Sequence, residues 1–158
     1  MFKKKNWIIL LLYLGFTLIF SNNAFLTMVF AENNLVIIAN NQVPVNSLSS
    51  EEIKNIFLGK KTQWDNGEKI KFVLFKKSEL SKKFLKEYIK KTPSQYKRYW
   101  KGLCFTGKAR TPKTFQTQKD IIEYISNNKN TIGYINIQVN KKDKLKIISI
   151  KNKKETSK

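Results

Sequence analysis

The sequence contains no histidine and a single cysteine, and these two scarcities exclude several classes of chemistry. Without histidine there is no imidazole ligand for a zinc site and no imidazole base for a Ser-His-Asp hydrolase. Cys104 has no partner for an internal disulfide and no histidine to activate its thiol, so we expect a small apolar core residue beside Leu103 and Phe105. We predict neither a metal site nor a cofactor.

Acidic residues are also scarce, with 11 Asp and Glu against 31 Lys and Arg, which gives a formal net charge of +20. The acids are scattered over turns and helix starts, and no spacing among them indicates the paired carboxylates of an acid–base catalyst. We therefore expect no enzyme. The positive charge is compatible with nucleic acid, an anionic membrane surface or a small anion. Nucleic acid is disfavoured because the chain reads as exported and because Arg98 and Arg110 are its only arginines, the side chains best suited to bidentate recognition.

Residues 1–31 have the pattern of an export signal and are expected to lie outside the fold. Three lysines near the N-terminus precede an almost unbroken apolar run from Trp7 to Phe20, and Val29 and Ala31 supply small residues at the −3 and −1 positions before Glu32. Cleavage before Glu32 would release a periplasmic protein. The alternative is an uncleaved membrane anchor, since residues 8–30 approach the roughly 20 apolar residues that a span requires.

Strand and helix patterns alternate after the export signal, and no linker divides them. We therefore expect one domain over residues 32–150, followed by a charged tail over residues 151–158. The predicted strands are 35–39, 70–75, 131–136 and 145–150, and the predicted helices are 50–58, 79–90, 93–101 and 117–127. This alternation indicates an α/β fold with a mostly parallel sheet flanked by helices. Residues 35–39 form an apolar run that is typical of a buried parallel strand, while residues 105–115 read as a polar loop.

The clearest local signal is the stretch SLSSEEIKNIFLGKKTQWDNG. Ser49 and Glu52 have the spacing of a capping box at a helix start. An apolar stripe follows and ends at Phe57, and Gly59 has the position of a helix C-cap glycine. Trp64 then precedes an Asp-Asn-Gly turn, and we expect this large side chain to lie in the core.

These residues also carry a family resemblance. The run LSSEEIKNIFLGKKTQWDNG resembles the signature of phosphate-type periplasmic substrate-binding proteins, in which a short helix ends in Ile-Phe-x-Gly and a Trp with a polar turn follows. The later run TIGYIN, residues 131–136, is similar to the family's Gly-Tyr strand. The resemblance covers roughly residues 35 to 137 and implies one lobe of a type II periplasmic-binding-protein-like fold. Full-length members close two lobes on a ligand, so a lone lobe would need a partner or a dimer to enclose a small ion.

The sequence also predicts where an anion would bind. Ligands of such sheets bind outside the carboxyl ends of the strands, where helix N-termini present free N–H groups and a partial positive charge. The strand that ends at Phe75 is followed by Lys76, Lys77 and Ser78, and Ser78 is the expected N-cap of the next helix. The candidate anion site is therefore Lys76, Lys77, Ser78 and the first-turn amides as far as Ser81.

The resemblance implies an Arg after this strand and then a Ser-Gly-Thr turn that holds the oxyanion. Ser78 matches the Ser, whereas Glu79 and Leu80 stand in the Gly and Thr positions, and only lysines are available in place of the Arg. A plain reading of this segment is a solvated turn with a helix cap. A second candidate is the loop that contains Arg110 and Thr111, where the guanidinium could supply a forked donor, and its plain reading is a basic surface loop.

Two functions follow from these expectations. The first is an exported solute-binding protein, related to the substrate-binding proteins of phosphate ABC transporters, that binds a small oxyanion such as phosphate or docks to transporter membrane subunits or a membrane sensor. The second is a ligand-free protein-interaction domain derived from the same fold.

Overall fold

The computed structural model describes residues 35–76, 78–136 and 144–151. The predicted export signal, Lys77 and all but the first residue of the predicted tail lie outside these described residues. Among the residues that are described, no helix is both long and apolar enough to cross a membrane.

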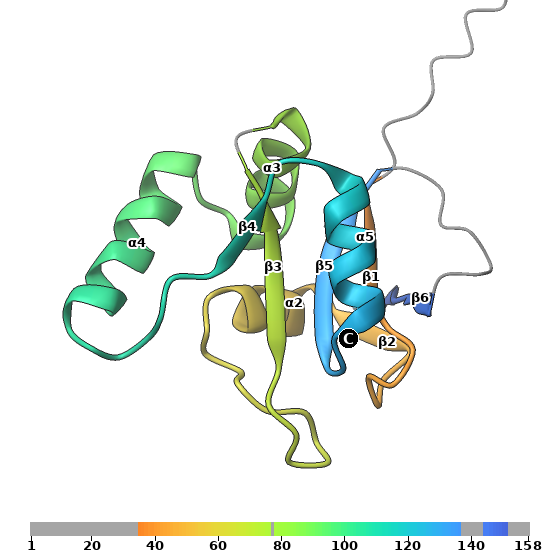
Figure 1. Cartoon of the computed structure of the whole chain (residues 1–158). Coiled ribbons are helices and arrows are strands. Elements are labelled where there is room, and N and C mark those ends of the chain that lie inside the picture. Colours follow the sequence, from red (N-terminus) through yellow and green to blue (C-terminus); the bar gives the residue numbers. More distant parts are fainter. Residues whose placement is uncertain (1–34, 77, 137–143, 152–158) are drawn as a thin grey trace, which may run out of the picture. The chain divides into compact units, whose positions relative to one another are not determined.

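A five-stranded sheet forms the centre of the domain, in the order β4-β3-β5-β1-β6 (Figure 1). Its strands are β1 (Val36–Asn40), β3 (Lys71–Phe75), β4 (Lys113–Phe115), β5 (Thr131–Ile135) and β6 (Leu145–Ile147). β3 pairs in parallel with β4 and β5, while β1 pairs antiparallel with both β5 and β6, so four strands share one direction. The predicted α/β fold with a mostly parallel sheet is confirmed.

The predicted parallel direction of the first strand is wrong. β1 is antiparallel to both of its neighbours, although it is buried as expected. An apolar run reports that both faces of a strand are covered, but it carries no information about strand direction. Direction depends on the connections, which are not local.

Two short strands and the break in a third were not predicted. The predicted strand 145–150 is two strands, β6 and β7 (Ser149–Lys151), on either side of the buried Ile148. β7 pairs in parallel with β2 (Ser47–Ser49) in a separate two-stranded sheet, and β4 lies in the predicted polar loop. A three-residue strand is too short for an alternating pattern to be recognised.

Helices begin where the sequence predicts them. They are α2 (Ser50–Phe57), α3 (Glu79–Phe84), α4 (Pro93–Phe105) and α5 (Gln118–Asn127), and a π-helical turn, η2 (Leu85–Ile89), continues α3. Capping boxes are present at Ser49 and Thr92, and Ser78 and Thr117 cap the other two helices through their side-chain oxygens. Each cap satisfies an N–H group that the helix itself leaves unpaired.

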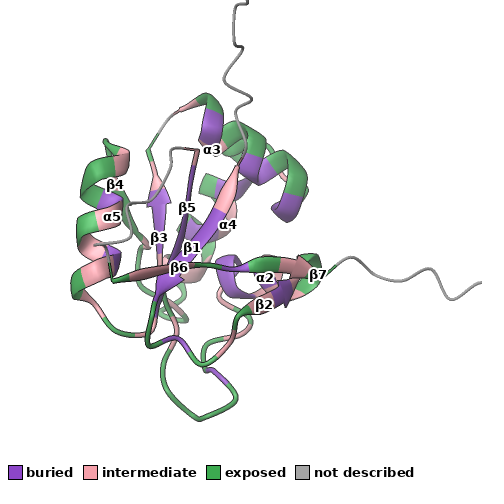
Figure 2. Ribbon diagram, turned by 90° about the vertical axis from the view of Figure 1, so that its right-hand side faces the viewer, coloured by how far each residue is buried: buried purple, intermediate pink, exposed green. Residues whose placement is uncertain are grey.

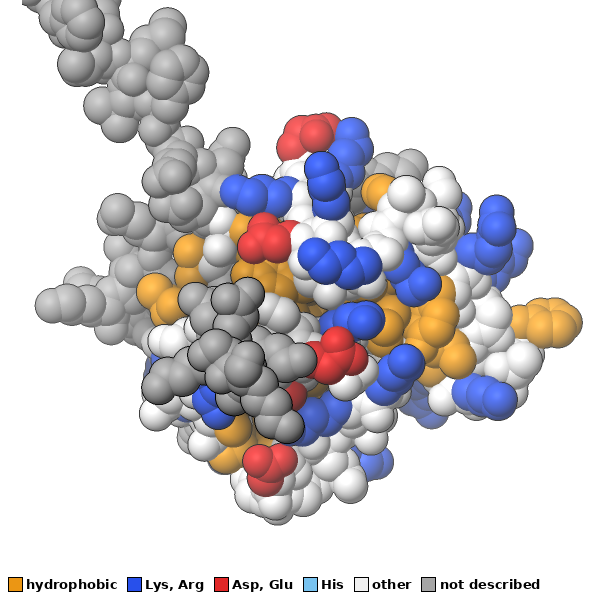
Figure 3. Space-filling model, turned by 180° about the vertical axis from the view of Figure 1, so that it is seen from behind, with side chains coloured by type: hydrophobic (Ala, Val, Ile, Leu, Met, Phe, Trp, Pro, Cys, Tyr) orange, Lys and Arg blue, Asp and Glu red, His pale blue; other side chains and the backbone are white. Residues whose placement is uncertain are grey.

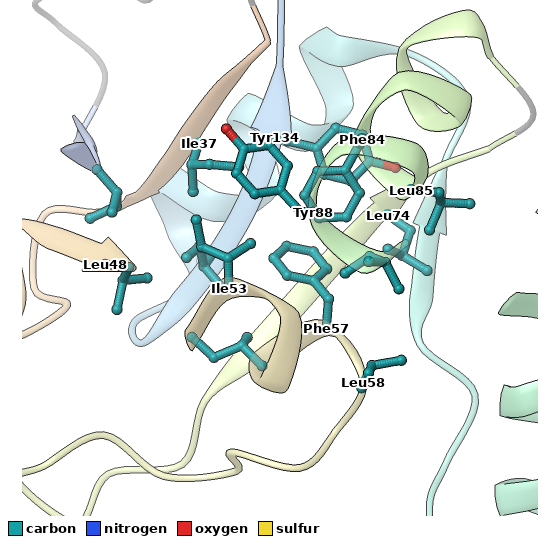
Figure 4. Packing of buried hydrophobic residues seen from close by; sticks show 14 of the residues in the cluster. Ile37, Leu48, Ile53, Phe57, Leu58, Leu74, Phe84, Leu85, Tyr88 and Tyr134 are labelled. Atoms are coloured by element: carbon teal, nitrogen blue, oxygen red, sulfur yellow. The ribbon is translucent and has the colours of Figure 1, made fainter. Parts of the chain in front are cut away.

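The helices cover both faces of the sheet. Ile121 and Ile125 of α5 pack on Val73 on one face. On the other face, α2, α3 and η2 enclose the larger core cluster, and Figure 2 shows buried positions along the central strands. Figure 4 shows the rings of Phe84 and Tyr134 at the centre of this cluster, stacked with centroids 4.0 Å apart.

Trp64 and two aromatics of α4, Tyr96 and Trp100, lie in the same cluster. Trp64 is 2% exposed, as predicted. Trp100 packs on Phe72 with ring centroids 5.6 Å apart. The Tyr96 hydroxyl donates to the Phe57 carbonyl at 2.7 Å. These contacts fasten α4 to the end of α2.

The expectation that Cys104 is a small core residue is wrong. Cys104 and Leu103 are only partly buried, and Phe105 is 92% exposed. α4 extends four residues beyond its predicted end at Lys101, and Leu103 in this extension packs against the larger core cluster.

Candidate functional site

The carboxyl ends of β3, β4 and β5 meet at one rim of the sheet, because these strands run in the same direction. Figure 1 shows the starts of α3 and α5 at this rim. An α/β sheet places its ligands at such a rim, beside helix N-termini. We therefore define the rim by five residues. Lys76, Ser78 and Ser81 follow β3, Gln118 begins α5, and Asn136 follows the end of β5.

Ser78 and Ser81 form the first turn of α3. The Ser78 Oγ accepts the Ser81 main-chain N–H at 3.0 Å, so one of the three amides expected to face an anion is occupied by the cap. The amides of Glu79 and Leu80 precede the first intrahelical bond and stay oriented toward the rim. Lys76 is exposed, and its main-chain N–H donates to the Phe115 carbonyl at 2.8 Å.

Tyr134 connects this turn to the sheet. Its buried hydroxyl accepts the Phe75 N–H at 3.2 Å and donates to the Ser81 Oγ at 3.3 Å. Burial raises the pKa of Tyr134, although both hydrogen bonds act in the opposite direction, so the phenol is a neutral donor. The sequence analysis placed Tyr134 on a strand without a role. A tyrosine in an apolar strand could have indicated this role, because a buried hydroxyl group needs a hydrogen-bond partner.

A polar pair closes the neighbouring part of the rim. The Asn136 N–H donates to the Gln118 Oε1 at 2.7 Å, and the Gln118 side-chain amide donates in return to the Asn136 Oδ1. Both side chains are half-buried. This pair was not predicted, although Asn136 directly follows a buried strand, and the site at Ser78 was also sought beyond the carboxyl end of a strand.

The second predicted candidate lies elsewhere. Arg110 and Thr111 precede β4, in which Lys113 pairs with Val73 and Phe115 with Phe75, so they approach the amino ends of the strands. Thr111 is roughly 13 Å from Phe115 along the strand direction, at about 3.3 Å per residue. Both side chains are exposed. The structure therefore brings Lys76, Ser78 and Ser81 together but keeps Arg110 and Thr111 apart from them.

The two residues that depart from the family pattern have different consequences. The Glu79 carboxylate forms an exposed ion pair with Lys82 at 2.6 Å, so its charge is partly compensated within the helix. Leu80 is 7% exposed, and its side chain belongs to the core. Leu80 can therefore offer a ligand its amide alone.

Two surface hollows lie away from the rim. One, of about 560 Å³, is lined by residues of α4 and its neighbours that include Arg98, Tyr99 and Leu103. The other, of about 440 Å³, lies between Lys82 and Pro93. Neither is lined by Lys76, Ser78 or Ser81. Within the described residues, no cluster of three Cys, Asp or Glu side chains could hold a metal ion.

A mainly parallel sheet with helices on both faces and polar helix starts at one rim is the architecture of a periplasmic-binding-protein lobe. The chain belongs to the PBP superfamily domain family, whose family model matches residues 16–157. The predicted family resemblance is confirmed.

Solved structures agree with this fold. A protein from Clostridium perfringens, described as a phosphate ABC transporter substrate-binding protein with bound phosphate, has a TM-score of 0.59 and 20% identity over 73% of this chain and 44% of its own. PstS from Borrelia burgdorferi has a TM-score of 0.58 and 20% identity, with 73% and 46% covered. A phosphate transport receptor from Vibrio cholerae has a TM-score of 0.50 and 20% identity, with 73% and 45% covered.

At this identity the solved structures establish the fold alone. The chain spans less than half the length of each of them. No curated protein matches the chain closely enough to add a relative.

Proposed function

We propose that this chain is an exported solute-binding lobe that binds a small oxyanion, with phosphate the first candidate, at the rim formed by Lys76, Ser78 and Ser81. The observation that supports this proposal is the Ser78 cap at the carboxyl end of β3, close to the exposed Lys76. The fold is also that of a protein solved with bound phosphate. The lobe presents the anion to transporter membrane subunits or a membrane sensor, and the partner or a second copy of the chain supplies the opposite wall.

The proposed chemistry uses donors that are already oriented. The Ser78 hydroxyl keeps its proton for a ligand while its oxygen accepts the Ser81 N–H. The Glu79 and Leu80 amides and the positive end of the helix add neutral donors and a partial charge. Lys76 adds a mobile ammonium group, which suits a phosphate as a point charge.

Thermal unfolding with and without phosphate or sulfate tests the proposal, with chloride at equal ionic strength as the reference. An anion at ten times its Kd stabilises the folded state by about 1.4 kcal/mol, which is about 4 °C for a domain of this size. Lys76→Gln should lose this shift. Lys71→Gln, an exposed lysine at the other end of β3, should keep it. Equal shifts with chloride, or equal losses in both variants, would contradict oxyanion binding at this rim.

The second candidate is a ligand-free interaction domain. It is favoured by the use of the Ser81 amide in the cap and by the acid in the first turn of α3. The genes beside this one discriminate the partners: membrane and ATPase subunits indicate a transporter, whereas a sensor kinase indicates signalling. If the oxyanion shift is absent, cross-linking to those encoded partners becomes the decisive measurement.

We propose in addition that residues 1–31 direct export and are removed before Glu32. N-terminal sequencing of protein recovered from outside the cytoplasm should begin near Glu32. An intact N-terminus in the membrane fraction would instead show a tethered protein.

A further inference from the structure

One continuous segment of the chain carries charge of a single sign. Between Glu87 and Asp120 the sequence holds no acidic residue and nine basic ones, which include both arginines of the chain. This segment comprises the end of η2, all of α4, the loop after it and β4. The segment is therefore distinguished by its lack of acids: it holds nine of the 31 basic residues of the chain and none of the 11 acids.

Exposed residues of α4 and of the loop after it make up a surface that we call the α4 face. Lys97, Lys101 and Phe105 follow one another at helical i, i+4, i+8 spacing and are all exposed. The remaining members of the α4 face are Arg98, Lys108 and Arg110. Figure 3 shows that the side of the molecule on which α4 lies carries basic and hydrophobic side chains without acidic ones.

Phe105 is an unusually exposed aromatic residue on this face. It is 92% exposed at the end of the basic row, whereas the other aromatic residues of α4 are turned inward. The Tyr96 and Tyr99 hydroxyls donate to the Phe57 and Leu58 carbonyls, both at 2.7 Å. The result is an exposed apolar ring surrounded by basic side chains. Interfacial membrane anchors combine apolar and basic side chains in the same way.

We propose that the α4 face docks on an anionic lipid surface, with Phe105 entering the acyl boundary and the basic side chains lying among the headgroup phosphates. Three of the five basic side chains of the face are lysines, and a compact, hydrated ammonium suits diffuse attraction to a charged surface better than the geometric recognition of carboxylates on a protein. A single-stranded nucleic acid would call for several outward aromatic rings on which bases stack, and only one ring of α4 points outward.

The surface next to this face extends the basic area. The 560 Å³ hollow has Tyr99 and Leu103 at its apolar part and Lys91, Arg98 and Lys108 around it. Through Lys91 it adjoins the smaller hollow between α3 and α4, which is also lined by lysines. The C-terminal end of α4 lies away from the rim at which the oxyanion is proposed to bind (Figure 1), so docking leaves that rim open. The two proposals are therefore independent.

A probe beside Phe105 gives a local measurement of docking. Cys104 is the only cysteine and is partly exposed, so a polarity-sensitive thiol dye can be attached there on the full chain. Phosphatidylcholine vesicles that contain phosphatidylglycerol should shift the dye emission to the blue, and salt should reverse the shift. Pure phosphatidylcholine should not shift it. Because residues 8–30 are present in every sample, only differences between lipid compositions and between variants are compared.

Two variants of equal net charge separate the α4 face from bulk charge. The test variant replaces three exposed lysines of the face: Lys97→Gln, Lys101→Gln and Lys108→Gln. The control replaces three exposed lysines on the α5–β5 turn, before β6 and in β7: Lys129→Gln, Lys144→Gln and Lys151→Gln. Each basic residue near an anionic bilayer contributes about fivefold to binding, so the test variant should lose about a hundredfold in vesicle affinity. The control should change little.

Phe105→Ser should weaken vesicle binding by about tenfold without changing the melting temperature, since the ring has no core contacts to lose. The proposal is overturned if phosphatidylglycerol causes no emission shift, or if the two triple variants lose the same affinity. It is also overturned if a polyglutamate peptide or an oligonucleotide gives a larger shift that depends on Phe105, because the partner would then be a protein or a nucleic acid.

Discussion

At the scale of single residues, the rim depends on one buried hydroxyl group. Tyr134 joins the end of β3 to the first turn of α3 by accepting from Phe75 and donating to Ser81. The phenyl part of the same residue stacks on Phe84 in the core. One side chain thus fixes both the packing of α3 and the orientation of its first turn.

Tyr134→Phe keeps the ring and removes only the hydroxyl, which leaves the Phe75 N–H without its acceptor. We expect the free energy of unfolding to fall by about 1–3 kcal/mol, the cost of an unsatisfied buried polar group. Tyr124→Phe is the matched control, because the Tyr124 hydroxyl forms no hydrogen bond with the described residues, and it should change stability by less than about 0.5 kcal/mol. Urea unfolding measures both, and equal losses would contradict the role assigned to Tyr134.

The sequence predicted the local members of the rim and missed the tertiary ones. Ser78 was found because an N-cap serine acts on an amide three residues away. Tyr134 lies 53 residues from Ser81, and nothing in the neighbouring residues of either one identifies the other. Gln118 and Asn136 meet for the same reason only after α5 and β5 have packed.

At the scale of elements, the helix predicted over residues 79–90 has an irregular second half. α3 changes at Leu85 into the π-helical turn η2, which ends at Lys90 in a left-handed conformation with φ 56°. The apolar spacing predicted the buried face correctly, since Leu80, Phe84 and Ile89 all lie in the core. The hydrogen-bond register did not follow from that spacing, because an apolar pattern indicates which side chains are buried and not which carbonyl each N–H group contacts.

Lys90→Gly should therefore stabilise the protein. Glycine adopts the left-handed region without the cost of about 1–2 kcal/mol that other residues incur, although its greater freedom in the unfolded chain removes part of the gain. We expect a net increase of about 0.5–1 kcal/mol in the free energy of unfolding. Asn130→Gly, at φ 61°, should give no increase, because Asn tolerates this conformation and donates to Glu68 at 3.1 Å. A destabilising Lys90→Gly would contradict the assigned backbone conformation.

The start of α2 should respond to acid through its capping box. The hydrogen bond from the Ser49 N–H, the largest influence, holds the pKa of Glu52 below its ordinary value of 4.5. Because the pKa is lower in the folded state, Glu52 stabilises the fold above about pH 4.5, and this contribution is lost as the pH falls through the folded-state pKa.

At neutral pH, the Glu52→Gln variant should be less stable than the parent protein. When the pH is reduced, its free energy of unfolding should fall by less than that of the parent. Glu51→Gln is the control, since Glu51 is exposed and takes no part in the capping box. Urea unfolding of the three proteins on both sides of that pH compares the losses. Parallel curves for the parent and Glu52→Gln would show that the capping box does not contribute to acid sensitivity.

At the scale of the whole molecule, sequence and structure agree on architecture more than on topology. The alternation of strand and helix patterns, with clear helix caps, predicted an α/β fold with helices on both faces of the sheet. Burial patterns and helix starts can be predicted because they depend on residues that are close together in the sequence. The antiparallel direction of β1 and the pairing of β2 with β7 are long-range choices, made by residues about 100 positions apart in the chain. The candidate site shows the same difference between local and long-range information. Its residues come together only because β3, β4 and β5 run in the same direction, and that direction is a long-range property.

The net charge makes a prediction for the molecule as a unit. With 31 basic residues against 11 acids, at least 20 positive charges have no carboxylate of their own, and their mutual repulsion opposes the compact state. Sodium chloride screens this repulsion, since the Debye length falls from about 30 Å at 0.01 M to about 10 Å at 0.1 M.

The free energy of unfolding should therefore rise with sodium chloride, by an amount on the order of 1 kcal/mol. Removing three charges in the Lys129, Lys144 and Lys151 triple variant should raise stability at low salt and flatten the salt dependence. Guanidinium is itself a salt, so urea unfolding is the appropriate measurement. A stability that is constant or falls with salt would mean that the repulsion is already compensated, and a rise seen with phosphate but not with chloride would indicate specific binding instead of screening.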